Sequence, residues 1–164
     1  MKIVVFSDAH GNKKAIERIL DFNPDATYLI SLGDSEFRHK YLLDLNIIAV
    51  KGNYPLDGGI GYESILEIEG KKIFMTHGHK YGVRRDIREL VTKADETGVD
   101  IVLFGHTHIP YINRLNGVYY MNPGSIISPR SKHVPSYLIL NIEKGKEITY
   151  VFKEAQTNSL IDKL

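Results

Sequence analysis

The sequence predicts an α/β protein with two mixed β-sheets packed face to face and helices on the outside. Three observations lead to this prediction. Strand and helix patterns alternate from the first residues to Val50, which favours parallel strands joined by helical crossovers. Strand patterns dominate the second half, and strands outnumber helices by about three to one. A single sheet of about ten strands would be unusually wide, so two sheets are expected.

The first half of the chain carries buried strand patterns separated by helical segments. The apolar positions between Ala15 and Leu20 fall on one helical face, and Pro24 lies shortly beyond that helix. A second helix is expected at about Phe37–Leu43. Continuous apolar runs predict strands at Ile3–Phe6, Thr27–Leu32 and Ile47–Val50.

The second half carries mainly antiparallel signals and one amphipathic helix. The segments Glu63–Glu69 and Lys72–Met75 flank Gly70-Lys71 and predict a hairpin. A helix is expected at about Arg84–Thr97, ended by Gly98. The last ten residues are expected to form a short helix or a frayed tail. Further strands are predicted at Ile101–Phe104, Pro110–Leu115, Val118–Asn122, Ser136–Ile142 and Glu147–Lys153.

The bulk properties favour a single soluble domain over residues 1–164. Lysine and arginine number 21 against 20 aspartate and glutamate residues, so no global field attracts nucleic acid or an anionic membrane. The chain has no cysteine, which excludes disulfides and thiolate chemistry. The apolar start at Ile3–Phe6 is too short for a signal peptide, and no run reaches membrane-spanning length. A cytoplasmic protein is therefore expected.

Metal-ligand side chains recur wherever one of the buried strand patterns ends. In an open α/β sheet, ligands bind outside the carboxyl ends of the strands, so these side chains are expected to converge on one site. Their oxygen and nitrogen donors suit divalent metal ions. The candidate metal ligands are Asp8, His10, Asp34, Asn53, His77, His106 and His108.

Taken singly, each of these residues has an ordinary structural explanation. An aspartate after a strand is usually a helix cap or a turn former, and an isolated histidine is usually a hydrogen-bonded polar residue. The whole set at five strand ends is what indicates metal binding. His79 is equally compatible with two positions, one in contact with a metal ligand but not with the metal, and one exposed to solvent. His39 and His133 are expected at the surface.

The donor set also indicates a reaction class. Two ions held about 3.5 to 4 Å apart trap a hydroxide, activate it near neutral pH and clamp a phosphoryl group for in-line attack. Asp34 has two carboxylate oxygens and is suited to bridge two ions. Asp8, Asp34 and a bridging hydroxide leave one net positive charge on two divalent ions, which favours a phosphate oxygen. Phosphoester hydrolysis is the function that this predicts.

The motifs resemble the signature of the calcineurin-like metallophosphoesterase superfamily, in the order that superfamily uses. The resemblance spans about the first 125 residues and is closest to the small single-domain phosphodiesterases of bacteria and archaea. Those enzymes also share Asn122-Pro123-Gly124-Ser125 and Pro129-Arg130. The motifs that carry the resemblance are Asp8-Ala9-His10, Gly33-Asp34, Gly52-Asn53, His77 and Gly105-His106-Thr107-His108.

The resemblance implies a four-layer αββα sandwich and a division of the ligands between two ions. One ion is held by Asp8, His10 and His108, and the other by Asn53, His77 and His106, with Asp34 as the bridge. Asn53, His77 and Asp34 are the implied catalytic residues. Manganese is the metal that the resemblance favours, with nickel, iron and zinc as alternatives, because the donor set does not choose among them.

One position departs from the wider superfamily. Many members follow the Gly-Asn dipeptide with a histidine that protonates the leaving oxygen or stabilises the transition state, whereas this chain has Tyr54 there. The small phosphodiesterases are similar in lacking that histidine. Tyr54 is expected either to stack on an aromatic group of the substrate or to fill the loop. Tyr54 and Arg130 are the candidate substrate-binding residues.

The sequence is compatible with two functions from different classes. The favoured one is a metal-dependent phosphodiesterase in which a metal-bridging hydroxide attacks a small or nucleotide-like diester, without stable nucleic-acid or membrane binding. The alternative is a non-catalytic scaffold for protein contacts, because the chain also resembles the small subunit of retromer. A Rossmann-type nucleotide site is excluded, since residues 7–12 contain a single glycine. A homo-oligomer is left open, with Tyr119 and Tyr120 as candidate contacts.

Overall fold

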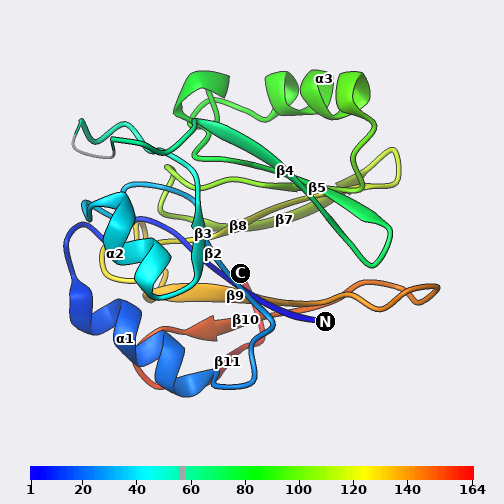
Figure 1. Ribbon diagram of the computed structural model, residues 1–164. Helices are drawn as coiled ribbons and strands as arrows, with labels where there is room; N and C mark the ends of the chain where they lie inside the picture. Colours follow the sequence, from blue (N-terminus) through cyan, green and yellow to red (C-terminus); the bar gives the residue numbers. More distant parts are fainter. Residues whose placement is uncertain (56–57) are drawn as a thin grey trace.

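Two β-sheets lie face to face in the computed structural model, with helices over their outer faces (Figure 1). The structure describes residues 1–55 and 58–164. The helix α3 covers one sheet, and α1 and α2 lie on the side of the other. This four-layer arrangement confirms the predicted αββα sandwich of two mixed sheets.

The first sheet contains the N-terminal strands and the C-terminal ones. The pairs β1 to β2 and β2 to β3 are parallel, as the alternating strand and helix pattern predicts, while β9 joins the other side of β1 in antiparallel fashion. The first strand of the chain therefore lies in the interior of its sheet. The strand order is β11 (Leu160–Ile161), β10 (Thr149–Glu154), β9 (Ser136–Asn141), β1 (Lys2–Phe6), β2 (Tyr28–Ser31) and β3 (Ile47–Ala49).

The second sheet is built from two hairpins around one central strand. The turn between β7 and β8 is Asn116-Gly117, with both residues at positive φ, as a tight hairpin turn of this type requires. The turn between β4 and β5 is Glu69-Gly70, one residue earlier than predicted, again with both at positive φ. The strand order is β4 (Glu63–Ile68), β5 (Lys71–Thr76), β6 (Ile101–Leu103), β8 (Val118–Pro123) and β7 (Pro110–Leu115).

The helices are short, and each begins or ends for an identifiable reason. Asn12 caps α1 (Lys13–Phe22) by accepting a hydrogen bond from the Ala15 amide. The helix α2 spans His39–Asp44, and a 3₁₀ turn spans His79–Tyr81. Gly98 in the left-handed conformation ends α3 (Arg88–Thr97). None of the helices in the described ranges is long and apolar enough to cross a bilayer.

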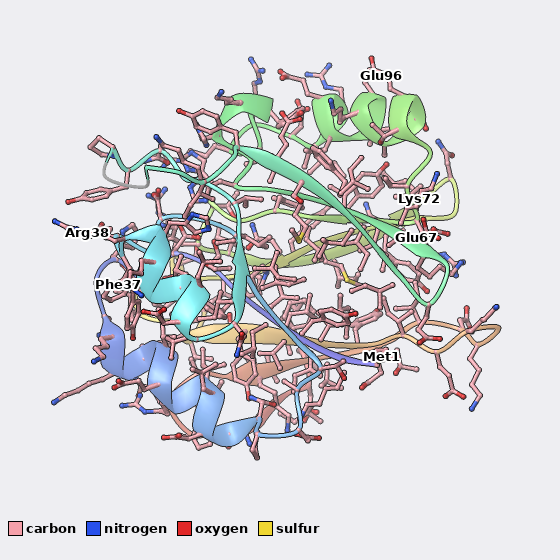
Figure 2. All side chains as sticks on the ribbon, in the orientation of Figure 1. Met1, Phe37, Arg38, Glu67, Lys72 and Glu96 are labelled. Atoms are coloured by element: carbon pink, nitrogen blue, oxygen red, sulfur yellow. The ribbon has the colours of Figure 1, made fainter. Side chains whose placement is uncertain are left out.

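Three apolar cores fill the spaces between the four layers, and alternation along β1 shows how they arise. Ile3 and Val5 point into the core between the sheets, while Val4 and Phe6 point into the core shared with α1. Leu90 and Ala94 of α3 close the third core over the second sheet. Figure 2 shows side chains filling the space between the sheets, with Glu96 of α3 directed away from it. This packing fixes the two sheets face to face.

Two elements differ from the sequence prediction. The helix predicted from Arg84 begins at Arg88, because residues 79–87 form a 3₁₀ turn and further turns after the left-handed Gly82. The prediction of a helix or tail at the C-terminus was wrong, because Leu160–Ile161 pair with β10 and extend the first sheet. That pairing depends on the free edge of β10, which the local sequence pattern does not reveal.

Candidate metal centre

The predicted ligands converge where strand ends from both sheets meet. Asp8 follows β1, Asp34 follows β2, and Asn53 comes from the loop after β3. From the second sheet, His77 follows β5 directly, and the histidines of the loop after β6 complete the cluster. The face-to-face packing of the sheets therefore brings the candidate metal ligands together.

Five of the candidate ligands have a left-handed backbone conformation. Residues other than glycine adopt this conformation rarely, and it concentrates at functional sites, where the surrounding structure holds it in place. In each case the positive φ lets the chain turn sharply after a strand. The φ values are 55° for Asp8, 43° for His10, 47° for Asp34, 68° for His106 and 60° for His108.

One group of donors forms around Asp8, His10 and His108. The Nε2 atom of His108 lies 3.1 Å from Oδ1 of Asp8 and 3.4 Å from Nε2 of His10. The Nε2 atom of His10 lies 4.0 Å from the same Asp8 oxygen. These donor atoms all lie within 4.8 Å of one another, which is close enough to surround a single ion.

A second group forms around Nε2 of His77. This atom lies 3.2 Å from Oδ1 of Asn53, 3.2 Å from Nδ1 of His106 and 3.5 Å from Oδ2 of Asp34. Oδ1 of Asp8 is 3.9 Å away, so Asp8 belongs to both groups. The two groups are therefore adjacent and share a carboxylate.

Hydrogen bonds fix which ring nitrogen faces the cluster. The Nδ1–H group of His77 donates to the carbonyl oxygen of Leu32 over 2.7 Å, and that of His108 donates to the carbonyl oxygen of Ser128 over 2.7 Å. Nε2 of each ring is then left with its lone pair toward the other donors. Such bonds fix the ring orientation and raise the basicity of the ligand nitrogen.

Glu36 is a residue of the site that the sequence patterns did not single out. Its Oε1 atom accepts a hydrogen bond from Nδ1 of His10 over 2.8 Å. Glu36 also has a left-handed backbone, with φ of 62°. Its position two residues after Asp34 could have indicated that Glu36 lies near the site. Nothing in the sequence indicates that it contacts a histidine of another loop.

The Asn122-Pro123-Gly124-Ser125 segment supports the ligand loops from behind. The Asn122 side-chain amide donates to the carbonyl oxygen of Gly105 over 2.8 Å and to Oγ1 of Thr107 over 3.1 Å. The Ser125 hydroxyl donates to the carbonyl oxygen of Asp8 over 2.9 Å. The segment therefore positions the β1 and β6 loops rather than supplying donors to the cluster.

Two glycines allow the backbone to approach the carboxylates closely. A Cβ atom on Gly52 would collide with Oδ1 and the amide nitrogen of Asp34. A Cβ atom on Gly105 would collide with Ser7 and would lie 3.2 Å from Oδ2 of Asp8. Only glycine fits at these positions without moving a candidate ligand.

Burial and the neighbouring charges shift the pKa values of several ligands. Burial opposes the charged form of Asp34, but its hydrogen bond and charge interaction with His77 outweigh this and lower its pKa to about 2. Burial also opposes charge on His77, whose pKa is nevertheless raised by Asp34 and Asp8. Burial, with the charges of His77 and Arg84, lowers the pKa of His106 to about 4. The Asp34 carboxylate therefore stays charged near neutral pH.

The donor atoms are better satisfied by a bound divalent cation than by hydrogen bonds to one another. Oδ1 of Asp8 is fully buried, yet within the described residues it receives no hydrogen bond of good geometry. A buried carboxylate oxygen without a hydrogen bond is costly, and a metal ion relieves that cost. Carboxylate oxygen, amide oxygen and imidazole nitrogen together form a donor set without sulfur, suited to manganese, iron, nickel or zinc.

The remaining residues of interest lie around the cluster. Nδ1 of His79 is buried with no hydrogen-bond partner in the described ranges, and its ring centre lies 5.4 Å from that of His77. The Tyr54 amide donates to Oδ1 of Asp34 over 2.9 Å. The Arg130 amide donates to the carbonyl oxygen of His108 over 3.1 Å. His39 and His133 are partly exposed and join neither donor group.

Comparison with known proteins agrees with this fold and identifies the family. The family model of the calcineurin-like phosphoesterase superfamily domain matches residues 1–145. The chain therefore belongs to the calcineurin-like phosphoesterase superfamily. This confirms the family that the sequence motifs resemble.

Individual relatives extend over nearly the whole chain. The chain is 31% identical to the probable metallophosphoesterase YsnB of Bacillus subtilis, over 94% of this chain and 92% of that protein. It is 27% identical to the phosphodiesterase YfcE of Escherichia coli, over 86% and 88% of the two chains. A predicted phosphoesterase of known structure from Streptococcus pneumoniae superposes with a TM-score of 0.90 at 28% identity, covering 99% of this chain and 94% of that one.

Proposed function

We propose that this phosphoesterase is a phosphodiesterase that uses two divalent metal ions to hydrolyse a small or nucleotide-like diester. The observation that carries the proposal is the pair of adjacent donor groups that share Asp8. Two groups within one site suit two ions better than one, because seven donors exceed what a single small ion accommodates. The similarity to a protein named as a phosphodiesterase supports the choice of a diester over a monoester.

The ligand division that we propose is the one that the family resemblance implies. Asp8, His10 and His108 hold one ion, and Asn53, His77 and His106 hold the other. Distances of 3.1 to 3.4 Å within each set support this division. Asp34 is proposed to bridge the ions, and its Oδ2 atom lies 3.5 Å from Nε2 of His77. Asp8, close to both groups, adds a second negative charge between them.

Bound divalent ions would supply a water of lowered pKa and positive charge for the phosphoryl oxygens. The residues of the chain would orient these ions and the substrate. The Nδ1–H groups of His10, His77 and His108 donate hydrogen bonds to the Glu36 carboxylate and to the carbonyl oxygens of Leu32 and Ser128, respectively. These bonds keep the Nε2 atoms of the three rings directed at the cluster. Asn53 is exposed, so its amide is open to the substrate as well as to an ion. Manganese is the metal that we propose, from the family resemblance.

The chain carries Tyr54 where many superfamily members carry a histidine acid. A positioned proton donor is typically worth 10²- to 10⁴-fold in rate. Without one, substrates with basic leaving groups should react slowly, while diesters with acidic leaving groups should not need the donor. We propose that the rate enhancement comes mainly from the positive charge that bound metal ions would supply to the transition state. We also propose that Arg130 contacts the substrate.

The test is metal analysis of the purified protein, followed by assays of a phosphodiester, a phosphomonoester and a phosphoprotein with added manganese. About two ions per chain and a preference for the diester are expected. A protein that binds metal yet hydrolyses none of the three would favour the scaffold function and would contradict the enzyme proposal. Preference for the monoester would contradict the diester assignment alone.

A further inference from the structure

A cavity of about 550 Å³ opens beside the metal centre. It lies between the segment that leads into α3 and the strands β6 and β7 of the second sheet. Its volume is within the range of about 300 to 1,000 Å³ that is usual for small-molecule sites. Its lining includes Arg84, Ile87, Thr107, Ile109, Tyr111 and Arg130.

The cavity lies next to the loop that carries two of the candidate ligands. Thr107, which lines it, stands between His106 and His108 in the chain. Arg130, also in the lining, holds the carbonyl oxygen of His108 through its amide over 3.1 Å. On the other side, the exposed Arg84 lines the cavity. The cavity therefore adjoins the loop that carries His106 and His108.

The floor of the cavity is apolar and partly aromatic. Phe104 and Val83 are buried beneath it, and Ile87, Ile109 and Tyr111 are only partly covered. The ring centres of Phe104 and Tyr111 are 5.8 Å apart and tilted by 59°. The Tyr111 hydroxyl accepts a hydrogen bond from Asn113, so the polar end of the ring is already partnered. A planar apolar group suits such a surface, because aromatic rings prefer tilted or offset neighbours.

Two of the charged residues at the rim lack an ion-pair partner within the described part of the chain. Asp86 pairs with Arg88 over 2.7 Å, and Arg85 approaches Glu89 at 3.4 Å. Neither Arg84 nor Arg130 has a carboxylate within 4.0 Å among residues 1–55 and 58–164. A free guanidinium group stacks on aromatic faces and attracts phosphate oxygens. The rim thus favours an anion that carries an aromatic ring.

We infer that this cavity binds an aromatic arm of the substrate, an aryl ring or a nucleobase, while the phosphate group lies at the metal centre. The inference rests on the proposed function and narrows its substrate class to diesters with at least one aromatic arm. Recognition comes from burial of the ring against Ile87, Ile109 and Tyr111, with Arg84 and Arg130 at the rim.

The test uses two phosphonates that cannot be hydrolysed, phenylphosphonate and methylphosphonate, on protein loaded with Zn²⁺. Methyl-resolved NMR of the isoleucine side chains reports where the ring lies, because an aromatic ring shifts nearby methyl signals. Phenylphosphonate should shift the signals of Ile87 and Ile109 but not that of Ile65, which does not line the cavity. Methylphosphonate should shift none of them by this mechanism.

Competitive inhibition of diester hydrolysis gives the second measurement. Phenylphosphonate should inhibit at a concentration at least about tenfold lower than methylphosphonate, since only the phenyl group buries apolar surface. Ile87→Ala should reduce this ratio at least about threefold and leave inhibition by methylphosphonate unchanged. Ile65→Ala, the matched change at an isoleucine that is 49% exposed on β4, should leave the ratio unchanged.

The outcomes separate this inference from the proposed function. Absence of the methyl shifts with phenylphosphonate would overturn the aromatic subsite, whatever the hydrolysis assays show. An unchanged inhibition ratio in Ile87→Ala would overturn it as well. Methyl shifts in a protein that hydrolyses no phosphodiester would support the subsite and contradict the proposed function alone.

Discussion

Nδ1 of His10 lies 2.8 Å from Oε1 of Glu36, and both residues hold a left-handed backbone. The hydrogen bond joins the loop after β1 to the loop after β2 across 26 positions of the chain. It leaves Nε2 of His10 directed at Asp8 and His108. Glu36 is thus a positioning residue for one of the two proposed ions.

Glu36→Gln should lower the affinity for the ion that Asp8, His10 and His108 are proposed to hold by about 10- to 100-fold. The neutral amide holds the ring less firmly and withdraws the negative charge that makes the imidazole more basic. Isothermal titration with Mn²⁺ measures the affinity. Glu17→Gln is the control, because Glu17 lies in an exposed ion pair with Lys13. Equal affinities for Glu36→Gln and the unaltered protein would show that the hydrogen bond is dispensable.

Asp34→Asn should weaken the binding of both proposed ions and remove nearly all hydrolysis. The fold should remain intact. The substitution keeps the size of the side chain but removes the charge that is proposed to bridge the ions. Metal content, diester turnover and thermal unfolding are the measurements. Asp44→Asn, which alters an exposed pair with Lys40, should change none of them. Wild-type turnover of Asp34→Asn with added manganese would rule out the dinuclear model.

His108→Ala should act chiefly on one ion, because only the group around Asp8 and His10 loses a donor. Elemental analysis should show the loss of about one equivalent of metal per chain. His133→Ala, at a partly exposed histidine outside both groups, should retain the full content. Retention of both ions by His108→Ala would refute the ligand assignment.

Gly52→Ala should destabilise the protein by about 1–3 kcal/mol and lower its metal affinity, because the new methyl group collides with the Asp34 side chain and amide. Gly58→Ala is a matched control, since a Cβ atom there meets nothing within 4 Å. Chemical denaturation and metal titration of both variants are the measurements. If the two variants behaved alike, close approach at Gly52 would have no bearing on the site.

Tyr54→His should flatten the dependence of rate on leaving-group pKa. A nearby imidazolium shares the charge on the departing oxygen, and this benefit grows with the basicity of the leaving group. The measurement is a rate series over aryl and alkyl phosphodiesters at fixed pH and saturating manganese, for both proteins. Equal slopes would mean that position 54 does not face the leaving group.

Local sequence patterns predicted most of the architecture because they report on local geometry. Alternation along a strand and turn pairs such as Asn116-Gly117 depend only on neighbouring residues. The start of α3 was misplaced because the apolar spacing continues through Ile87, although turns occupy that segment. The C-terminal strand was missed because two residues carry too little periodicity to distinguish a strand from a tail.

The sequence by itself determined which side chains are donors and that they follow strand ends, since both are properties of short segments. Only the tertiary structure decided which donors meet. His10 and His108 are 98 positions apart, and His77 and Asn53 come from different sides of the sandwich. Their contacts depend on how two sheets pack, and so do the Glu36 hydrogen bond and the cavity beside Thr107. Packing between sheets is set by many side chains at once, and no local pattern records it.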